Sequence, residues 1–486
     1  MTISSNAEAR DLPVIAIIGG GVSGAAVAFH LLQRRSLEPG QLFVFEPRER
    51  LGAGLAYDTR NPAHRINVPA ARMSLLPDDL EHFQRWLLTH DGMADDDAGI
   101  AENGGLFPRR AVFGHYINSM IQPFVEDGRL SHIRQRVDHI SRSDGRWILA
   151  GEAGQRVHAD ILVIATSHPS PLPPQVLQRA LAGHPRFIAD PTKSDALAAV
   201  RADDRMLVVG NGLTSADVIA SLVLRGHRGP ITAVSRRGLR SRGHARVKQE
   251  PVGDFVSHPS RTAVALLRRV RAAIRDVEGE GGSWHAVVDQ VRIQGRQLWN
   301  ALPLVERRRV VRHLRPFWDV HRFRVAPQVE DASERAIDDG RLEILAASIS
   351  SVEAAGGLIN CNFRLGRSDR RLERQFDAVV VTTGPGHRGI LQSQGWIEAM
   401  AKAGCLAMDP TGLGLACDMQ SRALDAAGAI VPALFISGPL ARGTFGELMG
   451  LPEVIEHAVL VAEQLAGAIV KGGKEVQGGH LATNAA

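Results

Sequence analysis

The chain has 486 residues, a length that corresponds to two to four domains. Hydrophobic residues make up 44% of it and charged residues 22%, a composition typical of globular proteins that excludes a disordered chain or one long coiled coil. The 57 basic residues exceed the 52 acidic residues, giving a net charge of +5, and this mild surplus suits nucleic acid, anionic substrates or phosphorylated cofactors.

Cysteine content and hydropathy exclude several further classes of protein. The three cysteines are far apart and form no CxxC pair, which excludes a disulfide framework, a zinc ribbon and a dithiol redox centre. The apolar runs are far shorter than the ~20 residues of a membrane helix, and the first residues lack the features of a signal peptide. We therefore expect a cytoplasmic protein without membrane contacts.

Residues 13–46 have the pattern of a strand, a glycine turn, a helix and a second strand. The run 14–18 is continuously apolar, as expected of a parallel strand that is buried on both faces. Residues 23–33 repeat apolar side chains at helical spacing, and the apolar run 42–45 ends at Glu46. This order is typical of the first half of a Rossmann fold.

The turn Gly19–Gly24 fits the GxGxxG pattern. Gly19 allows the tight turn, Gly21 lets a pyrophosphate approach the backbone, and Gly24 lets the helix pack close to the strand. The helix N-terminus then faces the phosphates. Glu46 follows Gly24 by 22 residues, at a strand end where a carboxylate accepts hydrogen bonds from an adenosine ribose. We predict a dinucleotide site here and assign it to FAD.

The next part of the chain connects this unit to a second one. We expect helices at 77–88 and 110–125 and three short strands within 132–165. The Pro-rich stretch 168–174 is stiff and is predicted to be a domain boundary.

Residues 206–234 repeat the strand, turn and helix of the first unit. The second strand ends in arginines instead of an acid, and an arginine pairs with a 2′-phosphate that a carboxylate would repel. This favours NADPH, with a solvated turn or stacking on the adenine of NADH as the alternative. The candidate residues of this second site are Gly210, Gly212, Ser215, Arg236 and Arg237.

These elements predict an α/β fold with two Rossmann-like dinucleotide-binding domains. The FAD domain is discontinuous, with a first part at 12–170 and a second part at 376–470. The NAD(P) domain at 200–375 is inserted between them and carries a helical, arginine-rich insertion at about 255–335. Residues 471–486 are expected to form a flexible tail.

A late strand at 434–436 is followed by Ser437 and Gly438. Related flavoproteins pass beside the flavin at this place with a Gly-Asp pair. We therefore expect Gly438 to contact the cofactor through its backbone instead of through a carboxylate, with an ordinary strand-to-loop turn as the alternative.

Two dinucleotide sites in one chain are typical of a flavin reductase or monooxygenase, in which one site holds FAD and the other delivers hydride from a nicotinamide. Disulfide reductases of this architecture need a redox-active cysteine pair beside the flavin, and this sequence lacks one. The electrons therefore need another acceptor, of which O₂ is the simplest. The histidines show no metal-ligand spacing, so we expect no metal site.

Five further segments are particular to this chain: His64–Ser74, Pro77–Asp79, Phe113–Tyr116, Ser235–Leu239 and Trp318–Arg322. Together they resemble a bacterial FAD/NAD(P)-binding family that includes FAD-dependent urate hydroxylases and L-aspartate N-monooxygenases. The resemblance covers residues 12–465 and implies FAD with NADH or NADPH. The length is more similar to that of the urate hydroxylases, which are associated with NADH, so the nicotinamide cofactor stays open.

The resemblance implies a monooxygenase that hydroxylates a small, electron-rich substrate through a flavin C4a-hydroperoxide. The main hypothesis is hydroxylation of urate to 5-hydroxyisourate in purine degradation, and the alternative is N-hydroxylation of an amino acid or amine. A third hypothesis, from another class, is a non-catalytic flavin redox sensor or a nucleic-acid-binding protein, supported only by the basic surplus.

His64, Arg72 and Arg322 are the candidate catalytic residues on the substrate side. A guanidinium binds a planar anion in a fork, which would suit the urate anion. The alternative for each residue is an ordinary structural hydrogen bond or a solvated helix face. The expected partners are a small-molecule substrate and O₂, without nucleic acid, and the oligomeric state stays open.

Overall fold

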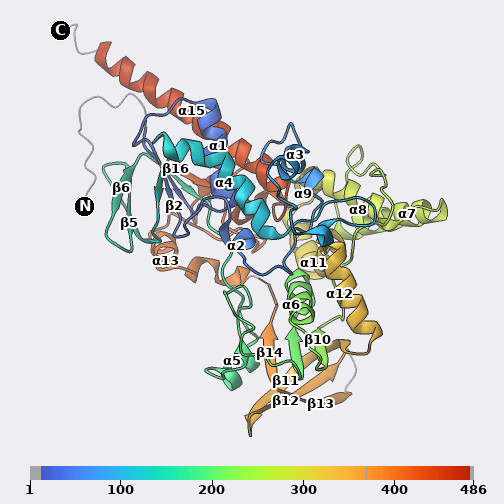
Figure 1. The fold of residues 1–486 in the computed structure, drawn as a ribbon. Helices are drawn as coiled ribbons and strands as arrows, with labels where there is room; N and C mark the ends of the chain where they lie inside the picture. Colours follow the sequence, from blue (N-terminus) through green and yellow to red (C-terminus); the bar gives the residue numbers. More distant parts are fainter. Residues whose placement is uncertain (1–12, 367–369, 385, 482–486) are drawn as a thin grey trace.

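The computed structural model describes residues 13–366, 370–384 and 386–481. It shows an α/β fold whose two large, mostly parallel sheets are joined by a helical region (Figure 1). The expected fold class, two dinucleotide-binding units with one inserted into the other, agrees with this arrangement of parallel sheets.

The first sheet has six strands in the order β15-β16-β7-β1-β2-β3. All neighbours pair in parallel except β15, which runs antiparallel to β16. The strands are β1 (Ile15–Ile18), β2 (Leu42–Phe45), β3 (Ser131–Ile133), β7 (Ile161–Ile164), β15 (Arg422–Leu424) and β16 (Ile430–Ile436).

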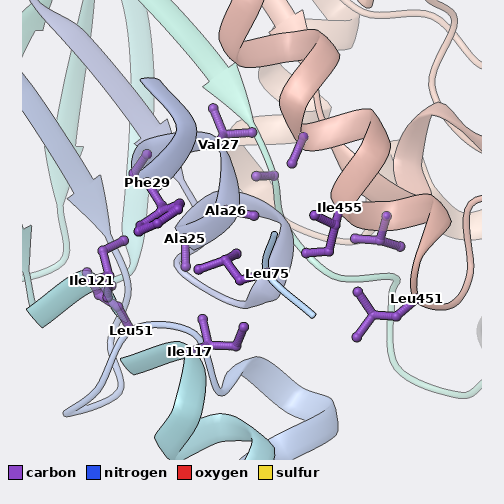
Figure 2. Close-up of a cluster of buried hydrophobic side chains, with 14 of the residues drawn as sticks. Ala25, Ala26, Val27, Phe29, Leu51, Leu75, Ile117, Ile121, Leu451 and Ile455 are labelled. Atoms are coloured by element: carbon purple, nitrogen blue, oxygen red, sulfur yellow. The ribbon is translucent and has the colours of Figure 1, made fainter. Parts of the chain in front are cut away.

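Both faces of this sheet are covered, which explains the continuous apolar run of β1. Ile15 and Ile17 point into one hydrophobic core, and Ala16 and Ile18 point into the other. The first core contains α1 (Val22–Arg34), α4 (Arg110–Glu126) and α15 (Glu453–Leu481). Ala25 and Ala26 of α1 are fully buried, and Figure 2 shows them in the cluster to which α15 contributes Ile455.

The opposite face of the first sheet packs against a small antiparallel sheet in the order β4-β5-β6. Trp147 of this sheet is fully buried and lies in the same core as Trp396 of α13 (Gly395–Lys402). The three strands are β4 (Val137–Ser143), β5 (Arg146–Gly151) and β6 (Arg156–Ala159).

The second sheet has seven strands in the order β13-β12-β11-β10-β9-β14-β8. Its parallel part is flanked by α6 (Leu213–Leu224) and α12 (Pro327–Asp338) on one side and by α5 (Gln175–Leu181) on the other. The strands are β8 (Phe187–Ile188), β9 (Met206–Val209), β10 (Ile231–Ser235), β11 (Leu342–Ala355), β12 (Leu358–Leu365), β13 (Arg371–Phe376) and β14 (Ala378–Val381).

The predicted helical insertion forms a separate group of helices beside the first unit (Figure 1). Its small core includes Phe255, Val287 and Leu298. The helices are α7 (Ala263–Gly279), α8 (Trp284–Ile293), α9 (Gly295–Ala301), α10 (Leu304–Arg309) and α11 (Arg315–Arg322), with a π-helical turn η3 at Val310–Leu314 between the last two.

Several predicted boundaries differ from the structure. The boundary at residue 376 was wrong, because β14 pairs with β9 and so belongs to the second sheet. Residues 131–164 hold five strands instead of three, because β4 to β6 form a separate antiparallel sheet. Residues 471–481 continue α15 as helix instead of forming a flexible tail, and residues 482–486, like residue 12, lie outside the described residues.

Two further findings concern only the residues that the structure describes. In that part of the chain, no helix is long and apolar enough to cross a membrane. The same residues contain no group of three or more His, Cys, Asp or Glu side chains that could hold a metal ion.

Candidate functional site

The first glycine turn connects the end of β1 to the start of α1 with very little space. Gly19 has φ +96°, and a Cβ on it would lie 2.7 Å from the Ala165 carbonyl oxygen. A Cβ on Gly24 would lie only 1.9 Å from the Gly19 carbonyl oxygen. Both positions therefore require glycine, and their close packing leaves the N-terminus of α1 at the carboxyl end of the sheet.

A second glycine pair, which sequence reasoning missed, packs against this turn. Gly52 and Gly54 have φ +91° and +52°, and the Gly52 amide donates to the Gly20 carbonyl over 2.7 Å. A Cβ on Gly21 would lie 3.2 Å from the Gly54 Cα, so Gly21 faces this backbone directly. The presence of two glycines shortly after the second strand could have predicted this close backbone packing.

Glu46 lies at the end of β2, as predicted, but both of its carboxylate oxygens already have partners. Oε2 accepts from the Gly20 amide at 3.1 Å, and Oε1 accepts from Arg48 Nη1 at 2.9 Å. Glu46 is buried, and its hydrogen bond from the Gly20 amide links the glycine turn to the end of β2. A ribose hydroxyl bound here would have to share these oxygens with the protein.

Two buried hydroxyls at the carboxyl ends of neighbouring strands have no partner. Thr166 follows β7 and Ser437 follows β16, and neither Oγ makes a hydrogen bond to any residue that the structure describes. Buried hydroxyls normally form hydrogen bonds, so these two remain available to bind a polar ligand at this edge of the sheet. The glycine turn, the helix N-terminus and these hydroxyls together fit the pyrophosphate and ribityl chain of FAD.

Gly438 lies against the start of α1, where a Cβ would be 2.2 Å from Ser23 Oγ. Its amide does not face open space, however, because it donates to Nδ1 of His457 over 3.1 Å. The other ring nitrogen of His457 is 2.7 Å from Ser421 Oγ. Burial, with the charge of Arg296, lowers the pKa of His457 to about 3, so this histidine is neutral and holds the turn. Any backbone contact of Gly438 with a cofactor would therefore use its carbonyl.

The second glycine turn repeats the first in the other sheet. Gly210 has φ +114°, and a Cβ on it would lie 2.5 Å from the Thr382 carbonyl oxygen, whereas a Cβ on Gly212 would have no atom of the described residues within 4 Å apart from its own chain neighbours. Three buried polar atoms around this turn lack partners among the described residues: Asn211 Nδ2, Ser215 Oγ and Ser235 Oγ. The open glycine and these atoms fit a second dinucleotide.

Arg236 and Arg237 follow β10 and are both exposed. Neither forms an ion pair with a carboxylate of the described residues. Their charges therefore remain available at the strand end where a dinucleotide places its adenosine.

His64 lies between the two units. Its Nδ1 is 3.0 Å from Thr59 Oγ1, and its Nε2 is 3.4 Å from Ser221 Oγ of α6. Burial lowers the pKa of His64, with Asp217 opposing the shift and Arg110 adding to it. Arg110 forms an ion pair with Asp217 at 2.8 Å across the same boundary. These contacts give His64 a role in joining the units.

The other two predicted substrate residues lie elsewhere. Arg72 is exposed at the end of the short helix η1 (Ala70–Arg72). Arg322 is buried at the end of α11, and its Nη2 lies 3.1 Å from Glu447 and 3.3 Å from Glu453. No hydrogen bond or ion pair among the described residues links His64, Arg72 and Arg322. Two carboxylates neutralise Arg322, which does not support the prediction that it binds an anion.

Sequence reasoning missed Arg442, a second buried arginine close to Arg322. Its positive charge is neutralised less completely than that of Arg322, because it has one ion-pair partner instead of two. Arg442 begins α14 (Arg442–Phe445), directly after the turn that follows β16, and is 3% exposed. Its nearest carboxylate oxygen belongs to Asp319 at 3.7 Å, and Arg315 holds that same side chain at 3.2 Å. Arg442 Nη1 has no hydrogen-bond partner in the part of the chain that the structure describes.

Among the residues that the structure describes, the buried ion-pair cluster around Arg322 and Arg442 joins one more arginine than carboxylate. They join four arginines to three carboxylates, and the members are Arg292, Arg315, Arg322 and Arg442 with Asp319, Glu447 and Glu453. Nearby, burial and the charges of Arg442 and Arg315 lower the pKa of His168 to about 3. His168 follows β7 and Arg442 follows β16, so a buried guanidinium and a neutral histidine both follow the carboxyl ends of neighbouring strands of the first sheet.

Comparisons with known proteins agree with the two-site architecture. A family model described as FAD-NAD(P)-binding matches residues 16–169, which span β1 to the Pro-rich segment after β7. No curated protein matches the sequence of the chain.

Solved structures with the same fold are similar to nearly the whole chain at low identity. L-lysine 6-monooxygenase from Pseudomonas syringae has 19% identity and a TM-score of 0.62, with 94% of this chain and 99% of that chain covered. Ornithine hydroxylase from Pseudomonas aeruginosa has 16% identity and a TM-score of 0.60, with 95% and 99% covered.

A third similar structure, of the cadaverine monooxygenase from Erwinia amylovora, contains FAD. It has 12% identity to this chain and a TM-score of 0.60, with 94% of this chain and 95% of that chain covered. At such identities the likeness shows the fold, in which parallel sheets form two dinucleotide-binding units.

Proposed function

We propose that this protein is an FAD-dependent, NAD(P)H-using monooxygenase that hydroxylates the nitrogen of a small amine carrying a carboxylate, such as an amino acid. The observation that carries the substrate class is the buried guanidinium of Arg442, which shares the Asp319 carboxylate with Arg315 and whose Nη1 has no hydrogen-bond partner among the described residues. The whole-length likeness in fold to three amine hydroxylases supports N-hydroxylation over the hydroxylation of urate.

The first unit would hold FAD, which supplies reduced flavin for the activation of O₂ when it is bound. Gly19, Gly21 and Gly24 would let the helix N-terminus face the pyrophosphate, and Glu46, whose Oε2 accepts from the Gly20 amide, would share its carboxylate with the ribose. The hydroxyls of Thr166 and Ser437, which are otherwise unsatisfied, would bond the remaining polar groups. The second turn, with Gly210, Gly212 and Ser215, would hold the pyrophosphate of NAD(P)H.

Arg442 would orient the substrate and help its nitrogen to react. Its free Nη1 donates to the carboxylate, which fixes the distance between that group and the flavin edge. The same positive charge disfavours a second cation nearby, so it lowers the pKa of the substrate amine towards the neutral form that can attack oxygen. The neutral His168 adds no further charge.

Urate is the second candidate, because a buried arginine also suits its planar anion. In that case the product would be 5-hydroxyisourate, as the sequence analysis predicted. His64 and Arg72 remain predicted substrate residues that no contact supports, and a role of the protein as a redox sensor has no structural observation in its favour.

A substrate panel separates these functions. We would measure NAD(P)H oxidation with L-aspartate, L-ornithine, L-lysine, cadaverine and urate, together with peroxide release, hydroxylamine formation and loss of urate absorbance. The expected result is hydroxylamine formation with one of the amino acids and none with cadaverine, which lacks a carboxylate. Turnover of urate alone would favour the second candidate, and a protein that binds no FAD would contradict both.

The arginines after β10 predict the choice of nicotinamide cofactor. Replacing Arg236 with alanine should raise the KM for NADPH about tenfold, because a charge-assisted contact to the 2′-phosphate is lost. The KM for NADH should stay within about twofold, since NADH has no 2′-phosphate. The measurement is steady-state oxidation of both cofactors. An equal change in the KM values for NADPH and NADH would show that Arg236 does not bind the 2′-phosphate.

A further inference from the structure

We propose that Phe317 of the helical insertion positions Arg237 for stacking on the adenine ring of NAD(P)H. This inference rests on the proposed use of a nicotinamide cofactor, but it adds a residue from outside the nucleotide-binding unit. It makes the arginine-rich insertion a part of the cofactor site.

Phe317 lies on α11 and is 45% exposed, which is unusual for a large aromatic side chain close to a proposed site. The Cζ atom of Arg237 lies 5.5 Å from the centroid of the Phe317 ring, within the range of a cation–π contact. Arg237 comes from the other unit, two residues after the end of β10. The contact therefore joins two parts of the chain that are 80 residues apart (317 minus 237).

Backbone hydrogen bonds hold α11 next to the end of β10. The Arg242 amide donates to the Val320 carbonyl at 2.8 Å, and the Val325 amide donates to the Arg242 carbonyl at 3.0 Å. Arg240 of the same loop forms an ion pair of 3.2 Å with Glu334 of α12. These contacts fix the loop after β10 against the insertion, so Phe317 stays beside the place where a dinucleotide puts its adenosine.

The ring is the only partner that the described residues offer to the Arg237 guanidinium through an ion pair or a cation–π contact. A guanidinium is planar and stacks on aromatic faces, and one face in contact with Phe317 leaves the other face open. Adenine is also a planar aromatic group that stacks on arginine. Phe317 would thus hold Arg237 in the orientation that adenine needs, while Arg236 remains exposed for a 2′-phosphate.

The test is direct binding of adenosine 2′,5′-bisphosphate and ADP to the purified full-length protein, measured by calorimetry. Phe317→Leu keeps an apolar side chain but removes the aromatic face, and it should weaken both ligands about fivefold. Phe317→Tyr keeps the ring and should bind within about twofold of the parent protein. Ile293→Ala, at a position of the same insertion that is 61% exposed, is the matched control and should change nothing.

A double-mutant cycle tests the link between the two residues. If Phe317 acts through Arg237, Phe317→Leu should have little further effect once Arg237 is alanine. Additive losses, or full affinity in Phe317→Leu, would overturn the proposal. A parent protein that binds neither ligand would instead contradict the nicotinamide site itself, so the two failures are distinguishable.

Discussion

Replacing Arg442 with glutamine is expected to reduce kcat/KM for the amino-acid substrate by about 100-fold or more, because a buried charge-assisted contact to the carboxylate is lost. The fold should survive this change. Arg315 still pairs with Asp319 in the variant. Removing the charge of Arg442 also leaves equal numbers of arginines and carboxylates in the buried ion-pair cluster. The amount of bound FAD per protein should therefore equal that of the parent.

The matched control is Arg312→Gln, an exposed arginine of the same helical region. It should retain the kcat/KM of the parent. Arg442→Lys should fall between the two, since lysine keeps the charge but loses the fork. If Arg442→Gln kept both full activity and full discrimination against cadaverine, Arg442 would not be the carboxylate-binding residue.

The second large effect is expected at Gly24. A Cβ on Gly24 would lie 1.9 Å from the Gly19 carbonyl oxygen and 3.0 Å from the Gly19 carbonyl carbon, and these backbone atoms cannot move aside as the end of a flexible side chain could. Gly24→Ala should therefore push α1 away from β1 and displace the helix N-terminus from the phosphates. We expect the purified variant to lose at least about nine-tenths of its FAD, a change of more than 1.4 kcal/mol in binding free energy.

Gly212→Ala is the comparison that separates the two units. Apart from its chain neighbours, no described residue has an atom within 4 Å of the position that its Cβ would take, so this variant should fold and keep FAD. Its affinity for NAD(P)H should fall about tenfold, because the added methyl group fills the space for the pyrophosphate. FAD absorbance and NAD(P)H titration measure both variants. Full FAD occupancy in Gly24→Ala would contradict the assignment of the first turn.

The repeating units could be predicted because their signals are local. An apolar run, a glycine turn and a helical pattern over residues 13–46 report directly on one strand, one turn and one helix. The structure confirms β1, α1 and β2 there, and β9, α6 and β10 in the second unit. Strand β13 was missed, and only three of the five strands within 131–164 were expected, because antiparallel strands such as β4 and β13 mix polar and apolar residues without a long apolar run.

The ion-pair partners of the buried arginines could not be predicted from the sequence. The sequence marks Arg322 and Arg442 alike as basic residues in polar segments. Only the fold determines that Glu447 and Glu453 lie next to Arg322 and that Asp319 is shared between Arg315 and Arg442. Ion pairing of this kind depends on contacts between segments more than 100 residues apart, which no motif reports.

The order of strands in the first sheet also constrains how the protein is made. Val163 of β7 pairs with Phe435 of β16, a separation of 272 residues (435 minus 163), and the complete second unit lies between them. During synthesis on the ribosome, the second unit is therefore finished before the first sheet can close. Until β16 is made, the edge of β7 that will pair with it stays open, and an open strand edge can pair wrongly with other chains. We therefore expect faster folding of the second unit to raise the yield of correctly folded protein.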